Sequence, residues 1–515
     1  MKKKVIITGL MAIIISCGGG GGSGSPTNQP TPHNGNSSNS TQNTEKNTTN
    51  TENINNIPNA SNPKKDNTEE NNSNKGIGHN DNSGKKDENR NQFPKPENID
   101  GKLLTGYGVK LGILDSDFLS EDAKTENLHG KLKDGFLVNP TFKEVIEQEF
   151  EGRLTAEPRV EGKLSKDEHG LMVTTIMAGK SGKGATESQI YAVSISNGKG
   201  FLIEEEKYRQ LQREGVRIYN QSFGTALEFT EHKRDYREKL ASLTLKENEI
   251  EQSVLLKRVD ALLNFYKEAV NEGSLFIWAA GNTVKDKTMN NPTIEGGLPA
   301  YISELRKGWI TVVGVSPDKK EYNKHLARAG EARYWSISAD GSCGLPGCGI
   351  TGSSFAAPKV TAVAAKVSQR FPWMTGHEIQ QTILTTAEDI GAVGIDTVFG
   401  WGYLDEEKAL KGPAEFNNIL LVGENADKAG ARGKFNANIG KDIISIFENN
   451  IKGDGGLEKN GKGTLILTGK NTYMGDTLIN EGNLEVYGLN GSNMTIEEKG
   501  TLVLFPEARI GLEGY

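Results

Sequence analysis

The stretch VKLGILD at residues 109–115 decides the fold of this chain. Its apolar run is typical of a strand buried on both faces, and an acid, Asp115, stands at its C-terminal end. Further strand patterns occupy residues 189–193, 218–219 and 275–278, and helical patterns occupy residues 171–178 and 255–270. Strands that alternate with helices predict an α/β domain with a mostly parallel sheet flanked by helices. Ligands bind such sheets beyond the carboxyl ends of the strands, where Asp115 falls.

Two other segments carry residues whose chemistry complements Asp115. HGLMV at residues 169–173 opens a helical pattern, and GITGSSFAAP at residues 349–358 contains a serine in a glycine-rich setting. A serine hydroxyl is a poor nucleophile at neutral pH, so it needs a base within hydrogen-bond reach, and that base needs an acid to fix its tautomer. Histidine titrates near neutrality and suits the role of the base. Asp115, His169 and Ser354 are therefore the candidate catalytic residues.

These segments resemble the subtilase family of serine peptidases. The chain order Asp, His, Ser is the order found in subtilisins. GSSFAAP at residues 352–358 matches the family pattern Gly-Thr-Ser-x-Ala-x-Pro, so Ser354 is the nucleophile and Ser353 takes the threonine place. The histidine pattern His-Gly-x-x-Val matches at His169. The resemblance implies a serine endopeptidase that works through an acyl-enzyme intermediate.

Two further matches extend the resemblance. AAGN at residues 279–282 matches the family segment in which the asparagine amide donates to the tetrahedral oxyanion, which implies this role for Asn282. QSFG at residues 221–224 matches the strand that pairs with the substrate backbone by strand addition. The resemblance therefore implies that Ser222, Phe223 and Gly224 bind substrate.

The resemblance covers residues 101–412, which we expect to form the peptidase domain. Near its end, FGWGYL at residues 399–404 resembles the subtilases of bacterial autotransporters. The chain departs from the family at Asp117, where a glycine is usual. The gap between Asp115 and His169 is also long for the family, which indicates an insertion beside the active site.

Two other classes of protein share parts of this pattern. A surface adhesin could keep a protease-like domain as a spacer, but it would not need all the catalytic positions intact. A lipase or esterase is expected to carry Gly-x-Ser-x-Gly and the order Ser, Asp, His, and this chain has neither. Labelling with a fluorophosphonate probe separates a peptidase from an inactive adhesin.

Residues 1–17 have the pattern of an export signal. Three lysines precede an apolar run that is too short to span a bilayer as a mature helix. The run ends in IISC at residues 14–17, which resembles a bacterial lipobox and predicts lipidation at Cys17. The alternative is an ordinary signal peptide with an unrelated cysteine. We expect an exported protein that lies at the bacterial cell surface or outer membrane or is released from it.

Residues 18–100 are predicted to form a disordered, low-complexity linker. Gly, Asn, Ser, Thr, Pro and Lys dominate, Phe93 is the only aromatic residue, and Leu and Val are absent. Such a segment cannot bury enough apolar surface to offset its chain entropy.

Residues 413–515 are predicted to be a β-strand repeat region. Short alternating segments separated by Gly and Asn stand at residues 464–467, 477–479, 483–486 and 501–504. They resemble the repeat of autotransporter passengers and predict the start of a parallel β-helix, which needs about three units to bury a core. We expect the 515 residues to be the N-terminal part of a longer autotransporter or a truncated copy, with any membrane barrel beyond Tyr515. The alternative is a complete lipoprotein protease with a small β domain.

The net charge and the sequence motifs limit which partners and cofactors are expected. A net charge of −7 argues against a nucleic-acid partner, because phosphate binding needs a basic face. The expected partners are protein or peptide substrates, and a membrane reached through the lipid at Cys17 and a barrel beyond Tyr515. The chemistry requires no cofactor. Many subtilases bind calcium structurally, but no segment of this sequence places such a site.

Two cysteines lie just before the nucleophile. Cys343 and Cys348 enclose Gly344, Pro346 and Gly347, which favour a tight turn, and an exported location permits oxidation. We therefore expect a disulfide that holds the loop before Ser354. The alternative is two free thiols.

Overall fold

The structure of the chain is a computed structural model. It describes residues 5–7, 98–99, 102–116, 118, 124–125, 128–132, 135–138, 140–157, 168–195, 203–225, 227–243, 251–282, 288–321, 326–422, 432–505 and 508–510. All of these residues belong to one compact unit. Cys17, Asp117 and nearly all of the predicted linker lie outside the described residues.

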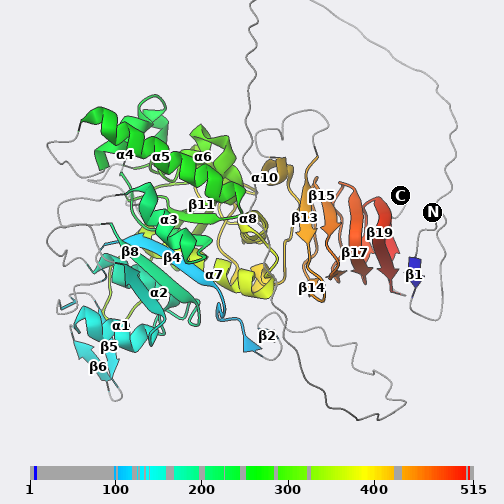
Figure 1. Cartoon of the computed structure of the whole chain (residues 1–515), viewed down its shortest axis with the longest axis horizontal. Helices are drawn as coiled ribbons and strands as arrows, with labels where there is room; N and C mark the ends of the chain where they lie inside the picture. The colour runs from blue at the N-terminus through cyan, green and yellow to red at the C-terminus, as the bar shows by residue number, and fades with distance from the viewer. Residues whose placement is uncertain are drawn as a thin grey trace, which may run out of the picture. The chain divides into compact units, whose positions relative to one another are not determined.

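A seven-stranded sheet forms the centre of the peptidase domain (Figure 1). Its order is β12-β11-β10-β9-β4-β8-β7, and every neighbouring pair is parallel. The strands are β4 (Lys110–Asp115), β7 (Leu154–Glu157), β8 (Gln189–Ser194), β9 (Ile218–Gln221), β10 (Leu275–Ala279), β11 (Trp309–Val315) and β12 (Ser336–Asp340). The predicted α/β fold with a mostly parallel sheet is confirmed.

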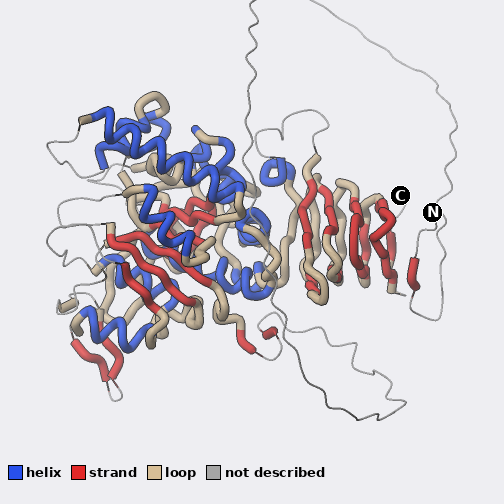
Figure 2. Tube along the Cα trace, viewed as in Figure 1, coloured by secondary structure: helices blue, strands red, loops and turns tan. Residues whose placement is uncertain are grey.

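Helices cover both faces of this sheet, as Figure 2 shows. In β10, Leu275 and Ile277 face one apolar core while Phe276 and Trp278 face another, because successive strand residues point to opposite faces. The first core holds α2 (His169–Ala178), α7 (Ser353–Arg370) and α8 (Gly376–Thr385), and the second holds α3 (Glu205–Arg213) and α5 (Gln252–Asn271). The shorter helices are α4 (Tyr236–Leu243), α6 (Leu298–Tyr301), α9 (Glu406–Ala409) and α10 (Asn418–Val422), with 3₁₀ turns η1 (Phe229–His232), η2 (Ser303–Gly308) and η3 (Gly330–Trp335).

The long segment between Asp115 and His169 has its own structure. It holds the antiparallel pair β5 (His129–Leu132) and β6 (Gly135–Val138), the helix α1 (Phe142–Phe150) and the edge strand β7. A capping box starts α1, since the Glu144 N–H donates to the Thr141 hydroxyl over 3.2 Å and the Thr141 N–H donates to the Glu144 carboxylate over 2.7 Å. A second small pair, β2 (Asn98–Ile99) with β3 (Lys102–Leu103), precedes the sheet.

The C-terminal strands stack in parallel as a β-solenoid (Figure 1). Leu457 pairs with Thr477 and Ile446 with Ile466, so one coil uses about 20 residues. The strands are β13 (Lys434–Asn438), β14 (Ile444–Phe447), β15 (Gly456–Asn460), β16 (Thr464–Leu467), β17 (Thr477–Val486), β18 (Leu489–Asn490), β19 (Met494–Leu504) and β20 (Arg509–Ile510), and β1 (Val5–Ile7) pairs with β19. The predicted start of a β-helix is confirmed, and strands β13, β14 and β15 precede residues 464–467, the first strand segment named from the sequence.

The first coil packs directly on the peptidase domain. Phe447 is buried against Phe371 at a ring-centroid distance of 5.6 Å, and the Trp373 indole N–H donates to the Ser445 hydroxyl over 2.6 Å. Arg370 pairs with Glu448 at 3.4 Å. One continuous apolar core therefore joins the two parts of the chain. No helix among the described residues is both long enough and apolar enough to cross a membrane.

Candidate active site

Asp115 and His169 meet where strand β4 ends and helix α2 begins. Asp115 Oδ1 lies 2.7 Å from His169 Nδ1, and the same oxygen accepts the Ser116 N–H over 2.7 Å. Because a carboxylate can only accept, Nδ1 carries the proton in this bond, and the free electron pair stays on Nε2. Asp115 is 2% exposed, so this bond is shielded from water. The arrangement holds the imidazole in the tautomer of a general base.

Ser116 fixes the helix that carries the histidine. Its hydroxyl accepts the N–H of Gly170 over 2.8 Å, which satisfies a free donor in the first turn of α2. The end of β4 and the start of α2 are thus joined by two hydrogen bonds, Asp115–His169 and Ser116–Gly170. The sequence reasoning missed Ser116, because the contact joins residues 54 positions apart and only a small polar residue after the acid signals it.

Ser354 lies in the first turn of α7 and is tied to the end of β9. Pro358 sits inside this helix and has no N–H, so it cannot bond the carbonyl of Ser354 four residues earlier. The Ser222 hydroxyl donates to that carbonyl over 3.0 Å, and the Ser354 hydroxyl donates to the Ser222 carbonyl over 3.0 Å. Helix α7 also packs against α2, where the rings of Phe355 and His169 lie 5.9 Å apart. Ser354 therefore lies beside the predicted substrate strand, on a helix that packs against the helix of His169.

Asn282 follows strand β10 and is oriented by Ser353. Its Oδ1 accepts the Ser353 N–H over 2.9 Å and the Ser353 hydroxyl over 3.0 Å. The same hydroxyl accepts the Gly281 N–H over 3.0 Å. With Oδ1 held in this way, the Nδ2 donor points elsewhere and lies 3.3 Å from the position that a β-carbon on Gly352 would take. A glycine at 352 thus leaves space beside the amide donor.

The predicted substrate strand, residues 222–224, follows directly after β9. The Phe223 carbonyl accepts the indole N–H of Trp278 over 3.0 Å, which fixes the segment against the second core. The structure thus brings Ser222 and Ser354 together and places Asn282 against the residue before Ser354. Cys17 lies outside the described residues.

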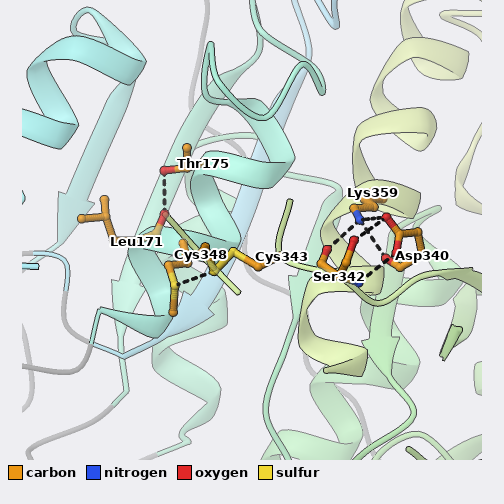
Figure 3. Close-up of a disulfide and its surroundings, with 8 residues drawn as sticks. Leu171, Thr175, Asp340, Ser342, Cys343, Cys348 and Lys359 are labelled. Atoms are coloured by element: carbon orange, nitrogen blue, oxygen red, sulfur yellow. Dashed lines mark hydrogen bonds and ion pairs between the residues drawn. A yellow bond between two sulfur atoms is a disulfide. The ribbon is translucent and has the colours of Figure 1, made fainter. Parts of the chain in front are cut away.

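A disulfide joins Cys343 and Cys348 in the loop before the nucleophile (Figure 3). Cys348 Sγ lies 3.8 Å from Sδ of Met172, one turn after His169, so the loop rests on the histidine helix. At the other side of the loop, Lys359 Nζ donates to the Asp340 carboxylate over 2.7 Å and to the Ser342 carbonyl over 2.8 Å. Burial lowers the pKa of Lys359, and its bond to Asp340 opposes that shift. The sequence reasoning did not identify Lys359.

No group of three or more His, Cys, Asp or Glu side chains in the described part of the chain could hold a metal ion.

Comparisons with known proteins agree with this geometry. Residues 106–402 match the subtilase family, and residues 457–486 match the passenger-associated-transport-repeat. The autotransporter lipoprotein NalP of Neisseria meningitidis serogroup B is 29% identical over 477 residues, which cover 80% of this chain and 42% of NalP. An extracellular serine protease of Serratia marcescens is 31% identical over 283 residues, which cover 45% of this chain and 27% of that protein.

Among solved structures, the Patellamide maturation protease PatA is similar with a TM-score of 0.40 and 19% identity. The similarity covers 59% of this chain and 96% of PatA. The chain spans less than half the length of the curated relatives named above. The subtilase match extends over more than half of the present chain and includes the segments that carry Asp115, His169, Asn282 and Ser354. The chain therefore belongs to the subtilase family of serine peptidases.

Proposed function

We propose that the chain is a serine endopeptidase in which Asp115, His169 and Ser354 form the catalytic triad and Asn282 donates to the oxyanion. The observation that carries the proposal is the 2.7 Å contact between Asp115 Oδ1 and His169 Nδ1, because it selects the imidazole tautomer that a serine nucleophile needs. The orientation of Asn282 by Ser353 supports the oxyanion role.

The reaction follows from these positions. His169 Nε2 takes the proton of the Ser354 hydroxyl as Oγ attacks the peptide carbonyl, and the negative charge that develops on the carbonyl oxygen faces Asn282 Nδ2. Collapse breaks the C–N bond, and His169 gives its proton to the departing amine. A water molecule, activated by the same imidazole, then hydrolyses the acyl-enzyme. The Asp115 carboxylate stabilises the imidazolium that forms.

Hydrolysis by the full chain tests the proposal. Ser354→Ala should reduce peptide hydrolysis to the background that binding and oxyanion stabilisation leave, and it should abolish labelling by a fluorophosphonate. The exposed Ser253 offers a matched control, since Ser253→Ala should keep both. Absence of labelling in the folded wild-type chain would instead favour an inactive surface adhesin.

We also propose the organisation and location of the chain. Residues 1–17 are the export signal, 18–100 the linker, 101–412 the peptidase domain and 413–515 the β-repeat region of an exported autotransporter subtilase. The similarity to NalP, whose name describes an autotransporter lipoprotein, supports a lipid on Cys17 and a cell-surface or released location. Mass spectrometry of the mature chain should find a modified Cys17 at the N-terminus. An unmodified N-terminus at another residue would exclude the anchor.

A further inference from the structure

Glu295 is a buried carboxylate for which the reaction above has no role. It lies between β10 and α6 and is 2% exposed. Its Oε2 accepts the N–H of Thr225 over 3.2 Å and the Thr225 hydroxyl over 3.0 Å. Its Oε1 is buried and has no hydrogen-bond partner among the described residues, and among these residues no salt bridge joins Glu295 to a Lys or Arg. An unsatisfied buried carboxylate oxygen is costly, so this position calls for a functional explanation.

Two glycines of the active-site segments lie against this carboxylate and its neighbour. A β-carbon placed on Gly224 would lie 3.1 Å from Glu295 Oε2 and 3.1 Å from the Thr293 hydroxyl. A β-carbon placed on Gly281 would lie 2.5 Å from the Thr293 methyl group. The Thr293 N–H also donates to the Ala280 carbonyl over 2.8 Å. Thr293 and Glu295 therefore lie directly behind the two segments that flank the nucleophile.

The substrate path follows from the positions of Ser354 and Asn282. A peptide paired along residues 222–224 presents its reacting carbonyl to the Ser354 hydroxyl and to the Asn282 amide. The side chain on the N-terminal side of the cleaved bond, called P1, then enters between residues 222–224 and residues 280–281. Gly224 and Gly281 carry no side chain where these two segments meet Glu295 and Thr293.

We infer that Glu295 is the residue that determines specificity at P1, and that the enzyme cleaves after lysine or arginine. The inference rests on the proposed peptidase function and adds its substrate class. An ammonium or guanidinium group supplies donors to the unsatisfied Oε1 and opposite charge to a carboxylate that has no cationic partner among the described residues. A buried polar group left unpaired by a neutral P1 side chain is a strong source of discrimination.

The protonation of Glu295 supports this reading. Burial raises the pKa of Glu295, and the hydrogen bonds that its carboxylate accepts from Thr225 oppose that shift. The titratable groups that it influences are the phenols of Tyr208 and Tyr266, whose own pKa values are raised by burial, so both stay neutral around pH 7. A cation at P1 favours the ionised carboxylate. Affinity for a basic P1 group should therefore weaken as the pH falls through the raised pKa, and affinity for a neutral P1 group should not.

Binding of p-aminobenzamidine, a fluorescent mimic of the arginine head group, tests the subsite without catalysis. Wild type and Ser354→Ala should bind it equally, because the substitution at Ser354 leaves Glu295 unaltered. Glu295→Gln, which keeps the size of the side chain, should weaken binding about 100-fold. Glu378→Gln is the matched control, since Glu378 is another buried glutamate, 5% exposed, but caps helix α8. Unchanged binding in Glu295→Gln would overturn the inference.

A peptide series that differs only at P1 gives the second readout on the full chain. Wild type should cleave after Arg or Lys with kcat/KM about 100-fold above Leu, Phe and citrulline, which is the neutral analogue of arginine. Glu295→Gln should remove this preference and keep cleavage after Leu and fluorophosphonate labelling, which reports a folded active site. A wild-type preference for Leu or Phe would overturn the subsite. A different result would separate the two proposals. If the chain binds p-aminobenzamidine through Glu295 but neither cleaves peptides nor reacts with the fluorophosphonate, the peptidase function is overturned and the subsite is retained.

Discussion

Ser353 holds Asn282, the proposed oxyanion donor, through two bonds to its Oδ1 and accepts one bond from Gly281. Ser353→Ala keeps the backbone bond but removes the hydroxyl that fixes the amide. We expect kcat to fall about fivefold with KM little changed, because an oxyanion bond acts mainly in the transition state and one hydrogen bond is worth about 1 kcal/mol. Steady-state kinetics will measure this, with Ser353→Thr as the control that keeps the hydroxyl. An equal loss in both variants would show that packing is responsible.

Residues that stand in short sequence patterns could be proposed from the sequence alone. Residues whose role depends on contacts with distant parts of the chain could not. Asp115, His169 and Ser354 each stand in a short pattern next to the strand or helix that positions them. Ser116 and Glu295 work through contacts with residues 54 and 70 positions away. No local pattern marks such contacts, since they exist only once β4, β9 and β10 lie side by side.

At the scale of elements, the same reason explains why the sequence analysis named no strand between residues 413 and 464. Strand β13 alternates fully, with Phe435 and Ala437 buried and Lys434, Asn436 and Asn438 exposed. Its sequence KFNAN is short and polar, so its buried face is recognisable only when the next coil stacks on it. The predicted strands 464–467 and 477–479 carry longer apolar runs and lie within β16 and β17.

The disulfide loop should affect both stability and rate. Cys343→Ser combined with Cys348→Ser should lower the free energy of unfolding by about 2 kcal/mol, the chain-entropy value for so small a loop. It should also lower kcat, because the loop rests on helix α2 and leads directly to Ser354. Thermal unfolding and peptide kinetics with and without reductant measure both effects. Reductant should weaken the wild type and leave the double variant unchanged, and equal responses would contradict the role of the disulfide.

Lys459 should make the stability of the solenoid rise as the pH increases from about 8. Its side chain is fully buried and donates to the carbonyls of Asn460, Gly461 and Glu481 over 2.8, 2.8 and 3.0 Å. Burial lowers its pKa to about 8 from an ordinary value of 10.5. Between these two pH values the unfolded chain binds more protons than the folded chain, so the free energy of unfolding rises with pH. The stability gained in this way is lost again as the pH falls through about 8.

Urea unfolding of the wild type and of Lys459→Met between pH 7.5 and 10 measures this effect, with the exposed Lys441→Met as control. The wild type should gain stability relative to Lys459→Met as the pH rises through this window. A constant difference between the two would show that the lysine is not titrating there.

At the scale of the whole molecule, the peptidase domain caps the first coil of the solenoid. Phe447 is fully buried between Phe371 and the coil residue Phe435, and Phe447→Ala should cost about 3–5 kcal/mol. Because the apolar core is continuous, we expect hydrogen exchange to accelerate in α7 and α8 as well as in the coils.

The matched control for Phe447→Ala is Leu502→Ala, which removes a buried side chain from the outer strand β19 and should loosen only the outer coils. Unchanged exchange in α7 and α8 of Phe447→Ala would mean that the two parts of the chain are energetically independent.

The stacking of coils also gives the molecule a mechanical polarity. The inner coil is attached to the peptidase domain by Arg370, Trp373 and Phe371, whereas each outer coil is attached to the next coil through one layer of strand pairs. Force applied at the C-terminal side should therefore peel the coils away one by one, as in a repeat protein with nearest-neighbour coupling. Each coil of about 20 residues should release about 60 Å of contour length, and the peptidase domain should yield last.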